Sequence, residues 1–203
     1  MRSVADILYT YGDEVYANLT NKCNCRCTFC IRFQTDGLGS ADTLWHQENP
    51  DWEAVKAAMD TFDFTGYKEL VFCGYGEPTC ALDLLLKAAK YAKEPYGLKT
   101  RLNTNGLGNL ENGRDIVPEL SKVIDSVSIS LNAENAKAYE AVTRPTFPDA
   151  YEAMLSFAKE CGKAISDVRF TIVDVLRDDA IEECKARAKE AGIPLRIRHF
   201  SHA

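Results

Sequence analysis

Apolar and polar residues follow two rhythms along the chain, and each rhythm predicts a different element. Short apolar runs between turn residues are typical of buried strands, whereas apolar residues that recur at helical spacing are typical of one face of a helix. The beginning of the chain shows a third pattern. Apolar and polar residues alternate within 7–11 and 14–19, on the two sides of a Gly-Asp turn, and this alternation predicts a hairpin. Its second strand leads directly into a loop rich in cysteine.

From that second strand onward, predicted strands and helices alternate about six times, which is the pattern of a parallel sheet. The later strands are expected over 69–73, 98–103, 126–131, 168–176 and 194–200, and the helices over 51–63, 81–94, within 113–124, and over 134–143, 149–164 and 178–191. A closed (βα)8 barrel typically needs about 250 residues, and the chain has 203. We therefore expect an α/β fold, a partial, open (βα)6 TIM-type barrel with a short N-terminal β-hairpin, forming a single domain over 1–203.

The cysteine-rich loop holds four of the chain's eight cysteines within eight consecutive positions. Cys23, Cys27 and Cys30 make a C-x3-C-x2-C spacing, and a short loop can direct these three thiolates to one iron–sulfur cluster. Each iron of a [4Fe–4S] cluster usually takes one cysteine, so three ligands would leave one iron open, as a reactive metal site requires. Cys25 does not fit this spacing, and we expect it to point out of the loop.

Two other interpretations of this loop fit the rest of the chain less well. A disulfide loop would need an oxidising compartment, and nothing in the sequence indicates export. A zinc site would need a fourth cysteine or histidine, commonly in a second pair, and no such pair follows the loop. Cys73, Cys80, Cys161 and Cys184 are scattered, so we expect no auxiliary cluster.

Glycines and polar residues follow several predicted strands, at the carboxyl ends that form one rim of a barrel. These segments are Gly74 to Pro78, Asn103 to Gly106, and Ser130 with Asn132. The glycines would let a ligand approach the backbone closely, and Glu77 would offer a carboxylate to an ammonium group. Each segment alone could equally be a tight turn or a strand-end cap.

The cysteine loop, with the aromatic residue Phe29 before its last cysteine, resembles the cluster loop of radical S-adenosylmethionine (SAM) enzymes. The Gly-x-Gly-Glu-Pro segment resembles the motif that holds the amino group of SAM in these enzymes, and Ser130 and Arg144 look similar to residues that hold its carboxylate. Asn105 and Asn132 look similar to polar contacts to its ribose or methionine part. The resemblance implies a [4Fe–4S] cluster on Cys23, Cys27 and Cys30, and SAM contacts from Phe29, Gly74, Gly76, Glu77, Asn105, Ser130, Asn132 and Arg144.

This resemblance also implies a reaction. The open iron would bind the amino nitrogen and a carboxylate oxygen of SAM. One electron would then cleave the C5′–S bond to give methionine and a 5′-deoxyadenosyl radical, which abstracts hydrogen from an unidentified substrate. A one-electron donor such as flavodoxin or ferredoxin would be the partner. Two other functions stay open: an iron–sulfur electron-transfer or scaffold protein without SAM chemistry, and an activase of a partner glycyl-radical enzyme.

Within the superfamily, most of the chain resembles the small radical SAM proteins that are named for their association with TatD-type hydrolases. The similar segments are Asn18–Cys23, Thr35–Gly37, Val71–Thr79, Leu102–Leu107 and Val127–Ala133. The association is one of gene neighbourhood, so it implies a functional link to a TatD-type hydrolase and no particular reaction.

The overall composition restricts the partners and the cellular compartment that we expect for the protein. A net charge of −6 argues against a general binder of phosphate backbones. No apolar run is long enough for a membrane span, and the N-terminal residues do not have the pattern of a signal peptide. Eight cysteines without an export signal indicate a reducing, cytoplasmic compartment.

One long irregular segment, residues 31–50, separates the cysteine loop from the first predicted helix. It contains Trp45 and His46, and its length for a compact domain allows a functional role. We expect a packed surface flap rather than a direct part in catalysis.

The last predicted strand carries alternating charges. Arg196 and Arg198 alternate with apolar residues and therefore share one face, where they either line the barrel mouth or are solvated. His199 and His202 follow, and a histidine at a strand end is a candidate acid–base or ligand-binding group.

Overall fold

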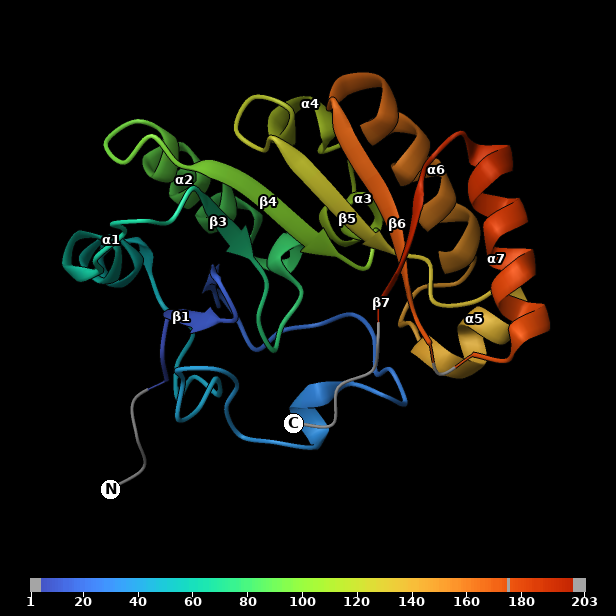
Figure 1. The fold of residues 1–203 in the computed structure, drawn as a ribbon, viewed down its shortest axis with the longest axis horizontal. Coiled ribbons are helices and arrows are strands. Elements are labelled where there is room, and N and C mark those ends of the chain that lie inside the picture. The colour runs from blue at the N-terminus through green and yellow to red at the C-terminus, as the bar shows by residue number, and fades with distance from the viewer. Residues whose placement is uncertain (1–4, 175, 199–203) are drawn as a thin grey trace.

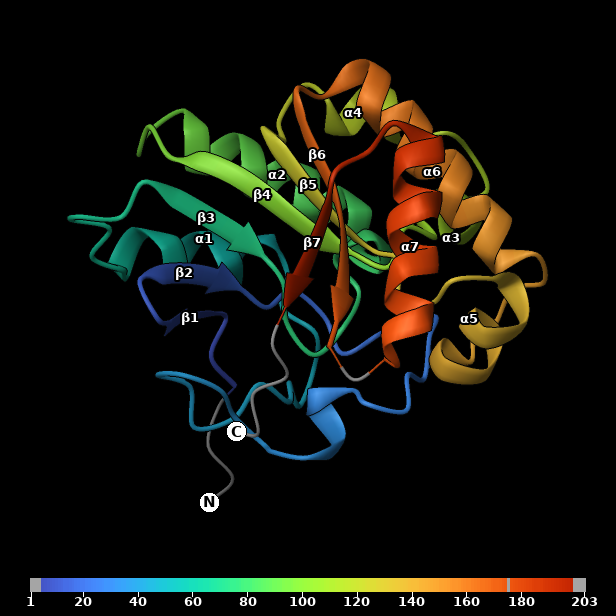
Figure 2. The same ribbon diagram turned by 45° about the vertical axis from the view of Figure 1, so that its right-hand side comes forward.

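A computed structural model describes residues 5–174 and 176–198 of the chain. Within this part, seven strands form one sheet whose spatial order is the order of the sequence (Figures 1 and 2). They are β1 (Leu8–Tyr11), β2 (Glu14–Ala17), β3 (Glu69–Phe72), β4 (Lys99–Thr104), β5 (Ser126–Ser130), β6 (Asp167–Val173) and β7 (Leu195–Arg198). The first pair is antiparallel and every later pair is parallel. The predicted hairpin and open six-stranded parallel sheet are therefore confirmed, with β1 and β7 at the two edges.

The connections between the strands are mostly helical, as an α/β fold requires. The helices are α1 (Trp52–Thr61), α2 (Leu82–Lys93), α3 (Gly108–Asn112), α4 (Val117–Leu120), α5 (Ala136–Thr143), α6 (Ala150–Ala164) and α7 (Asp178–Ala191), with 3-10 turns η1 (Ile31–Phe33) and η2 (Pro78–Ala81). Figures 1 and 2 show α2, α6 and α7 lying along one face of the sheet.

The hydrophobic core lies between this face of the sheet and the helices. Phe72, Leu102, Ile129 and Phe170 point into it from successive strands, and all four are fully buried. Because side chains alternate along a strand, the opposite face carries the intervening residues. This second face, called the inner face below, is largely polar and presents Arg101, Asn103, Ser128, Ser130, Arg169, Thr171, Arg196 and Arg198.

One helix of the described chain was not predicted. We expected a helix within 113–124, where α4 lies, but α3 precedes it over Gly108–Asn112. No side chain caps the start of α3, so the sequence carries no start signal there. Its end is marked by Gly113, which adopts a left-handed conformation with φ of 63°.

The segment 31–50 packs as the surface flap that we expected. Leu44 is fully buried in a small apolar cluster with Tyr9, Ala41 and Tyr75. The Trp45 ring meets the Tyr75 ring edge-on, with centroids 5.1 Å apart. The flap thus covers the glycine-rich segment that follows β3.

Two observations bear on the remaining sequence expectations. Among the helices of the described residues, none is both long and apolar enough to cross a membrane. The candidate groups His199 and His202 lie outside the described residues.

Candidate active site

The cysteine loop, defined here as Asn18–Cys30, leaves β2 at the carboxyl edge of the sheet. Asn18 fixes its start, because this fully buried side chain donates to the Leu44 carbonyl at 2.8 Å and accepts from the Tyr75 N–H at 3.3 Å. Further along, the Glu77 N–H donates to the Lys22 carbonyl at 2.8 Å. One side of the cysteine loop is therefore attached to the glycine-rich segment after β3.

The other side of the cysteine loop is attached to the end of α5. The N–H groups of Arg26 and Thr28 donate to the carbonyls of Thr143 and Val142, both at 2.9 Å. Carbonyls in the last turn of a helix have no partner within the helix, so they are free to accept such bonds. The Thr146 N–H adds a third contact, to the Asn24 carbonyl at 2.9 Å.

The three cysteines of the predicted cluster motif are free thiols and partly exposed. Burial raises the pKa of Cys23 to about 12 and also raises that of Cys30. The pKa of Cys27 is lowered, because the neighbouring Cys25 thiol donates a hydrogen bond to its sulfur. The backbone of the loop is attached on both sides, and its three free thiols match in kind and number the cysteine donors of an iron–sulfur cluster with one open iron.

Our expectation that Cys25 points out of the loop was wrong, because its thiol donates a hydrogen bond to the sulfur of Cys27. Cys25 is only 2% exposed and belongs to the hydrophobic core. The Asn105 amide nitrogen lies 3.5 Å from its sulfur. Burial is common for a cysteine that behaves as a small apolar residue. The spacing of cysteines along the sequence could not predict this burial.

Side chains that could bind a single metal ion do not converge anywhere in the described residues.

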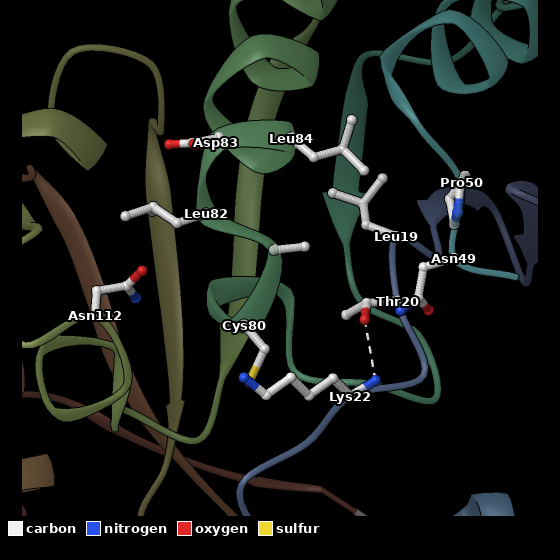
Figure 3. A pocket seen from close by; sticks show the side chains of 11 residues that line it. Leu19, Thr20, Lys22, Asn49, Pro50, Cys80, Leu82, Asp83, Leu84 and Asn112 are labelled. Atoms are coloured by element: carbon white, nitrogen blue, oxygen red, sulfur yellow. Dashed lines mark hydrogen bonds between the residues drawn. The ribbon is translucent and has the colours of Figure 1, made fainter.

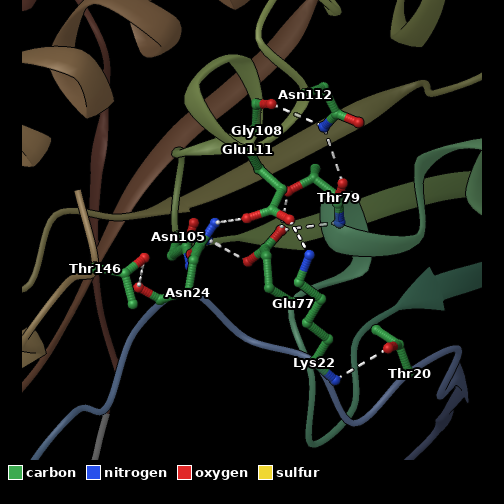
Figure 4. Close-up of polar contacts among 10 residues, drawn as sticks. All are labelled: Thr20, Lys22, Asn24, Glu77, Thr79, Asn105, Gly108, Glu111, Asn112 and Thr146. Atoms are coloured by element: carbon green, nitrogen blue, oxygen red, sulfur yellow. Dashed lines mark hydrogen bonds and ion pairs between the residues drawn. The ribbon is translucent and has the colours of Figure 1, made fainter.

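Glu77 is the most enclosed charged group of the site, with 4% exposure. Its Oε1 accepts from the Thr79 N–H at 3.1 Å, the Thr79 hydroxyl at 2.7 Å and the Thr104 hydroxyl at 2.7 Å, as Figure 4 shows in part. Its Oε2 accepts from the Asn105 N–H at 2.8 Å. Burial raises the pKa of Glu77, and these four hydrogen bonds oppose that rise. With three donors on Oε1 and one on Oε2, Oε2 keeps capacity for a further donor.

Gly74 and Gly76 allow two protein segments to approach each other. A Cβ on Gly74 would lie 2.2 Å from the Asn18 Oδ1, and a Cβ on Gly76 would lie 2.1 Å from the Thr20 carbonyl oxygen. We expected these glycines to make room for a ligand, but the space is occupied by the start of the cysteine loop. They therefore set the spacing between that loop and Glu77.

Asn105 connects the same two parts of the site. Its side-chain amide donates to the Asn24 Oδ1 at 2.6 Å, while its side-chain oxygen accepts from the Leu107 N–H at 3.0 Å. Together with its backbone bond to Glu77, these contacts make Asn105 a link between Glu77 and the cysteine loop (Figure 4).

Glu111 on α3 was missed by the sequence analysis. It accepts from the Asn24 amide at 3.2 Å and forms an ion pair with Lys22 (Figure 4). Asn112, the next residue, donates to the Thr79 carbonyl at 3.0 Å. The only available signal was Gly113, which marks the end of a short helix.

The remaining predicted SAM contacts come from the ends of β5 and α5 and from the cysteine loop. Ser130 is half-buried on the inner face. Asn132 is 6% exposed with φ of 60°, and its Oδ1 is buried without a partner among the described residues. Arg144 ends α5 with φ of 46° and is exposed. Phe29 is half-buried between Thr28 and Cys30.

The inner face continues from this site towards β7. Burial raises the pKa of Cys73, and the positive charge of Arg198 is the largest effect that opposes the rise. The pKa of Glu14 is lowered mainly by its hydrogen bonds to Tyr16 and Arg101, and the charge of Arg196 adds to this effect. Arg196 and Arg198 are exposed, and neither forms an ion pair within the described chain. Their charges therefore act across the inner face.

A separate pocket of about 420 Å³ lies beside the site, where α2 begins (Figure 3). It is lined in part by Thr20, Lys22, Cys80 and Asn112. Its lining excludes Glu77 and the three cysteines of the motif, so we do not place the cofactors there.

Fold and site together define a class: an open α/β barrel whose thiol-rich centre lies at the carboxyl edge of a parallel sheet. Residues 17–191 match the family model of the radical SAM superfamily, and the chain belongs to this superfamily. Its enzymes use a [4Fe–4S] cluster and SAM, which are the cofactors of this chain.

Several known proteins are similar to the chain. GTP 3′,8-cyclase of Paenarthrobacter nicotinovorans is 24% identical, over 91% of this chain and 50% of the relative. GTP 3′,8-cyclase of Streptomyces coelicolor is 27% identical, over 94% and 54%, respectively. A probable GTP 3′,8-cyclase of Thermococcus kodakarensis is 27% identical, over 89% and 54%. The chain thus spans about half the length of the curated relatives it matches.

A solved structure described as "Native anSMEcpe with bound AdoMet and Cp18Cys peptide" shares the fold. Its TM-score is 0.62 and its sequence is 18% identical, and the match covers 91% of this chain and 49% of that one. At this identity the likeness concerns the fold alone.

Proposed function

We propose that this chain binds a [4Fe–4S] cluster on Cys23, Cys27 and Cys30 and cleaves SAM reductively. The observation that carries the proposal is the cysteine loop itself, which hydrogen bonds fix between the Glu77 segment and the end of α5. When bound and reduced by a one-electron donor, such a cluster would supply the electron for reductive cleavage of SAM to methionine and a 5′-deoxyadenosyl radical, which would abstract hydrogen from the substrate.

The protein's own contribution is to orient SAM. Glu77 Oε2 accepts from the SAM amino group, because it is the carboxylate oxygen with spare capacity. The orphaned Asn132 Oδ1 accepts from a SAM hydroxyl or amine, and Ser130 and Arg144 hold the SAM carboxylate. Phe29 packs beside the cluster. Gly74, Gly76 and Asn105 keep Glu77 at the correct distance from the cysteine loop.

Nucleotides are the first class of substrate to test. The curated relatives are named GTP 3′,8-cyclases, and they match this chain over about half of their own length. The two exposed arginines on the inner face, Arg196 and Arg198, would suit the phosphates of such a molecule. An activase of a glycyl-radical enzyme is the less favoured alternative, because its only support is the sequence resemblance to radical SAM enzymes.

The proposal also includes the domain, the cellular compartment and the electron donor of the reaction. A single domain over 1–203 would act in the cytoplasm with flavodoxin or ferredoxin as electron donor. Membership of the TatD-associated group, and with it a functional link to a TatD-type hydrolase, rests on the sequence segments that resemble that group.

The deciding experiment is anaerobic reconstitution followed by dithionite and SAM, with and without GTP. The proposal requires formation of 5′-deoxyadenosine, and a nucleotide substrate would increase its rate. A stable brown protein that never consumes SAM would instead support an electron carrier or scaffold.

A further inference from the structure

Tyr139 on α5 has a buried hydroxyl group without a partner. The residue is fully buried, and its hydroxyl oxygen forms no hydrogen bond within the described chain. Buried hydroxyl groups are normally satisfied, and leaving one unpaired is costly. The nearby Thr143 hydroxyl donates its proton to the Tyr139 carbonyl at 2.8 Å, and it lies close enough to the phenol oxygen to lower the pKa of Tyr139 without meeting hydrogen-bond geometry. Among the described residues, the phenol O–H therefore has no acceptor within hydrogen-bond geometry.

The position of Tyr139 indicates where an acceptor would lie. Tyr139 is one helical turn before Val142 and Thr143, whose carbonyls bind the cysteine loop on either side of Cys27. It belongs to the same buried cluster as Cys25, and Cys27 packs against that cluster. After burial, the charges of Cys25 and Cys27 contribute most to raising the pKa of the phenol. The helical spacing therefore places Tyr139 beside the turn of α5 that binds the cysteine loop.

The phenol is also held rigidly. Its ring packs against the Tyr151 ring with centroids 5.4 Å apart. Tyr151 is itself fixed, because its hydroxyl donates to the Glu134 carbonyl at 3.0 Å. Tyr139 therefore cannot turn its hydroxyl towards solvent without disrupting this packing.

We propose that Tyr139 is a positioning residue whose hydroxyl donates a hydrogen bond to a sulfur of the bound cluster, either the Cys27 thiolate or an adjacent inorganic sulfide. The inference rests on the cluster assignment of the proposed function. A donated hydrogen bond stabilises the more negative, reduced form of a cluster, and hydrogen bonds to the sulfurs help to set its potential. Tyr139 would therefore make the cluster easier to reduce.

The test compares the reconstituted full-length Tyr139→Phe and Tyr151→Phe variants with the unaltered protein. Iron and sulfide content are measured first, and the midpoint potential is then obtained by anaerobic spectroelectrochemistry. We expect Tyr139→Phe to keep its iron and to shift the potential to more negative values. Tyr151→Phe should leave the potential unchanged, because its hydroxyl is bound to a backbone carbonyl.

An unchanged potential in a fully loaded Tyr139→Phe protein would overturn the inference. If that variant binds no cluster, Tyr139→His decides the question, because it retains an N–H donor. Cluster assembly in the His variant supports a donated hydrogen bond, whereas failure of both variants assigns Tyr139 a packing role and overturns the inference. If the unaltered protein forms no [4Fe–4S] cluster or does not cleave SAM, the proposed function itself fails, which is a distinguishable result.

Discussion

The N–H of Glu77 donates to the carbonyl oxygen of Lys22 at 2.8 Å, and this bond joins the two loops that make up the candidate site. Cys23 follows Lys22 directly, so the bond holds a predicted cluster ligand next to the predicted SAM acceptor. Gly76, immediately before Glu77, makes the approach possible. The distance between cluster and SAM sites thus depends on a glycine that touches neither cofactor.

Gly76→Ala should therefore destabilise the protein and impair cluster assembly. The added Cβ would lie 2.1 Å from the Thr20 carbonyl oxygen and 2.7 Å from that of Lys22, and backbone atoms cannot move aside easily. Overpacking of this kind typically costs about 1–3 kcal/mol. Urea unfolding measures the loss, and the iron content after reconstitution should fall with it.

Gly162→Ala on α6 is the matched control. Its Cβ would meet only the tip of the Ile193 side chain, at 3.0 Å. Alanine also has a higher helix propensity than glycine, by about 1 kcal/mol. Stability should remain equal or increase, and equal losses in the two variants would contradict the special role of Gly76.

The two neighbouring cysteines Cys25 and Cys27 should respond differently to substitution. Cys27→Ala removes a cluster ligand and should abolish the brown absorption of the [4Fe–4S] cluster. Cys25→Ala should retain the absorption. We expect it to lose some stability, because the side chain that is removed is buried. Visible spectra and iron content of the anaerobically reconstituted proteins measure both effects. Loss of the cluster in both variants would refute the ligand assignment.

Asn132→Gly should separate a SAM contact from a structural role. Asn132 has φ of 60°, which glycine adopts without strain, so its replacement should cost little stability. Loss of the buried Oδ1 should weaken SAM binding about tenfold, the value of one good hydrogen bond to a polar ligand. Anaerobic equilibrium binding of SAM checks this. Unchanged affinity would remove Asn132 from the SAM site.

The sequence was sufficient to predict the sheet order and the edge at which the polar segments after the strands meet, because both follow from local patterns. Apolar runs such as 69–73 and 126–131 define strands, and the polar residues directly after them must then meet at one edge. It could not predict the burial of Cys25 or the link from Asn105 to Asn24, since both depend on contacts between distant segments. Glu111 was missed for a related reason: its short helix has no capping residue at its start.

His46 should give the protein a pH-dependent stability. Its ring Nε2 lies 3.0 Å from the Asn18 carbonyl oxygen, and burial lowers its pKa below the ordinary value of 6.5, against the opposing effect of that contact. The unfolded chain therefore binds a proton more readily than the native protein does. Stability should fall as the pH decreases through 6.5 and below, because protonation favours the unfolded state.

Urea unfolding of the His46→Gln variant, compared with the unaltered protein at neutral and mildly acidic pH, tests this prediction. Glutamine keeps an N–H donor for the Asn18 carbonyl but does not titrate. The variant should therefore lose less stability on acidification than the unaltered protein, and an equal loss in both would show that His46 is not the source. Since Asn18 begins the cysteine loop, the same contact should also make cluster retention in the unaltered protein more sensitive to acid than in the variant.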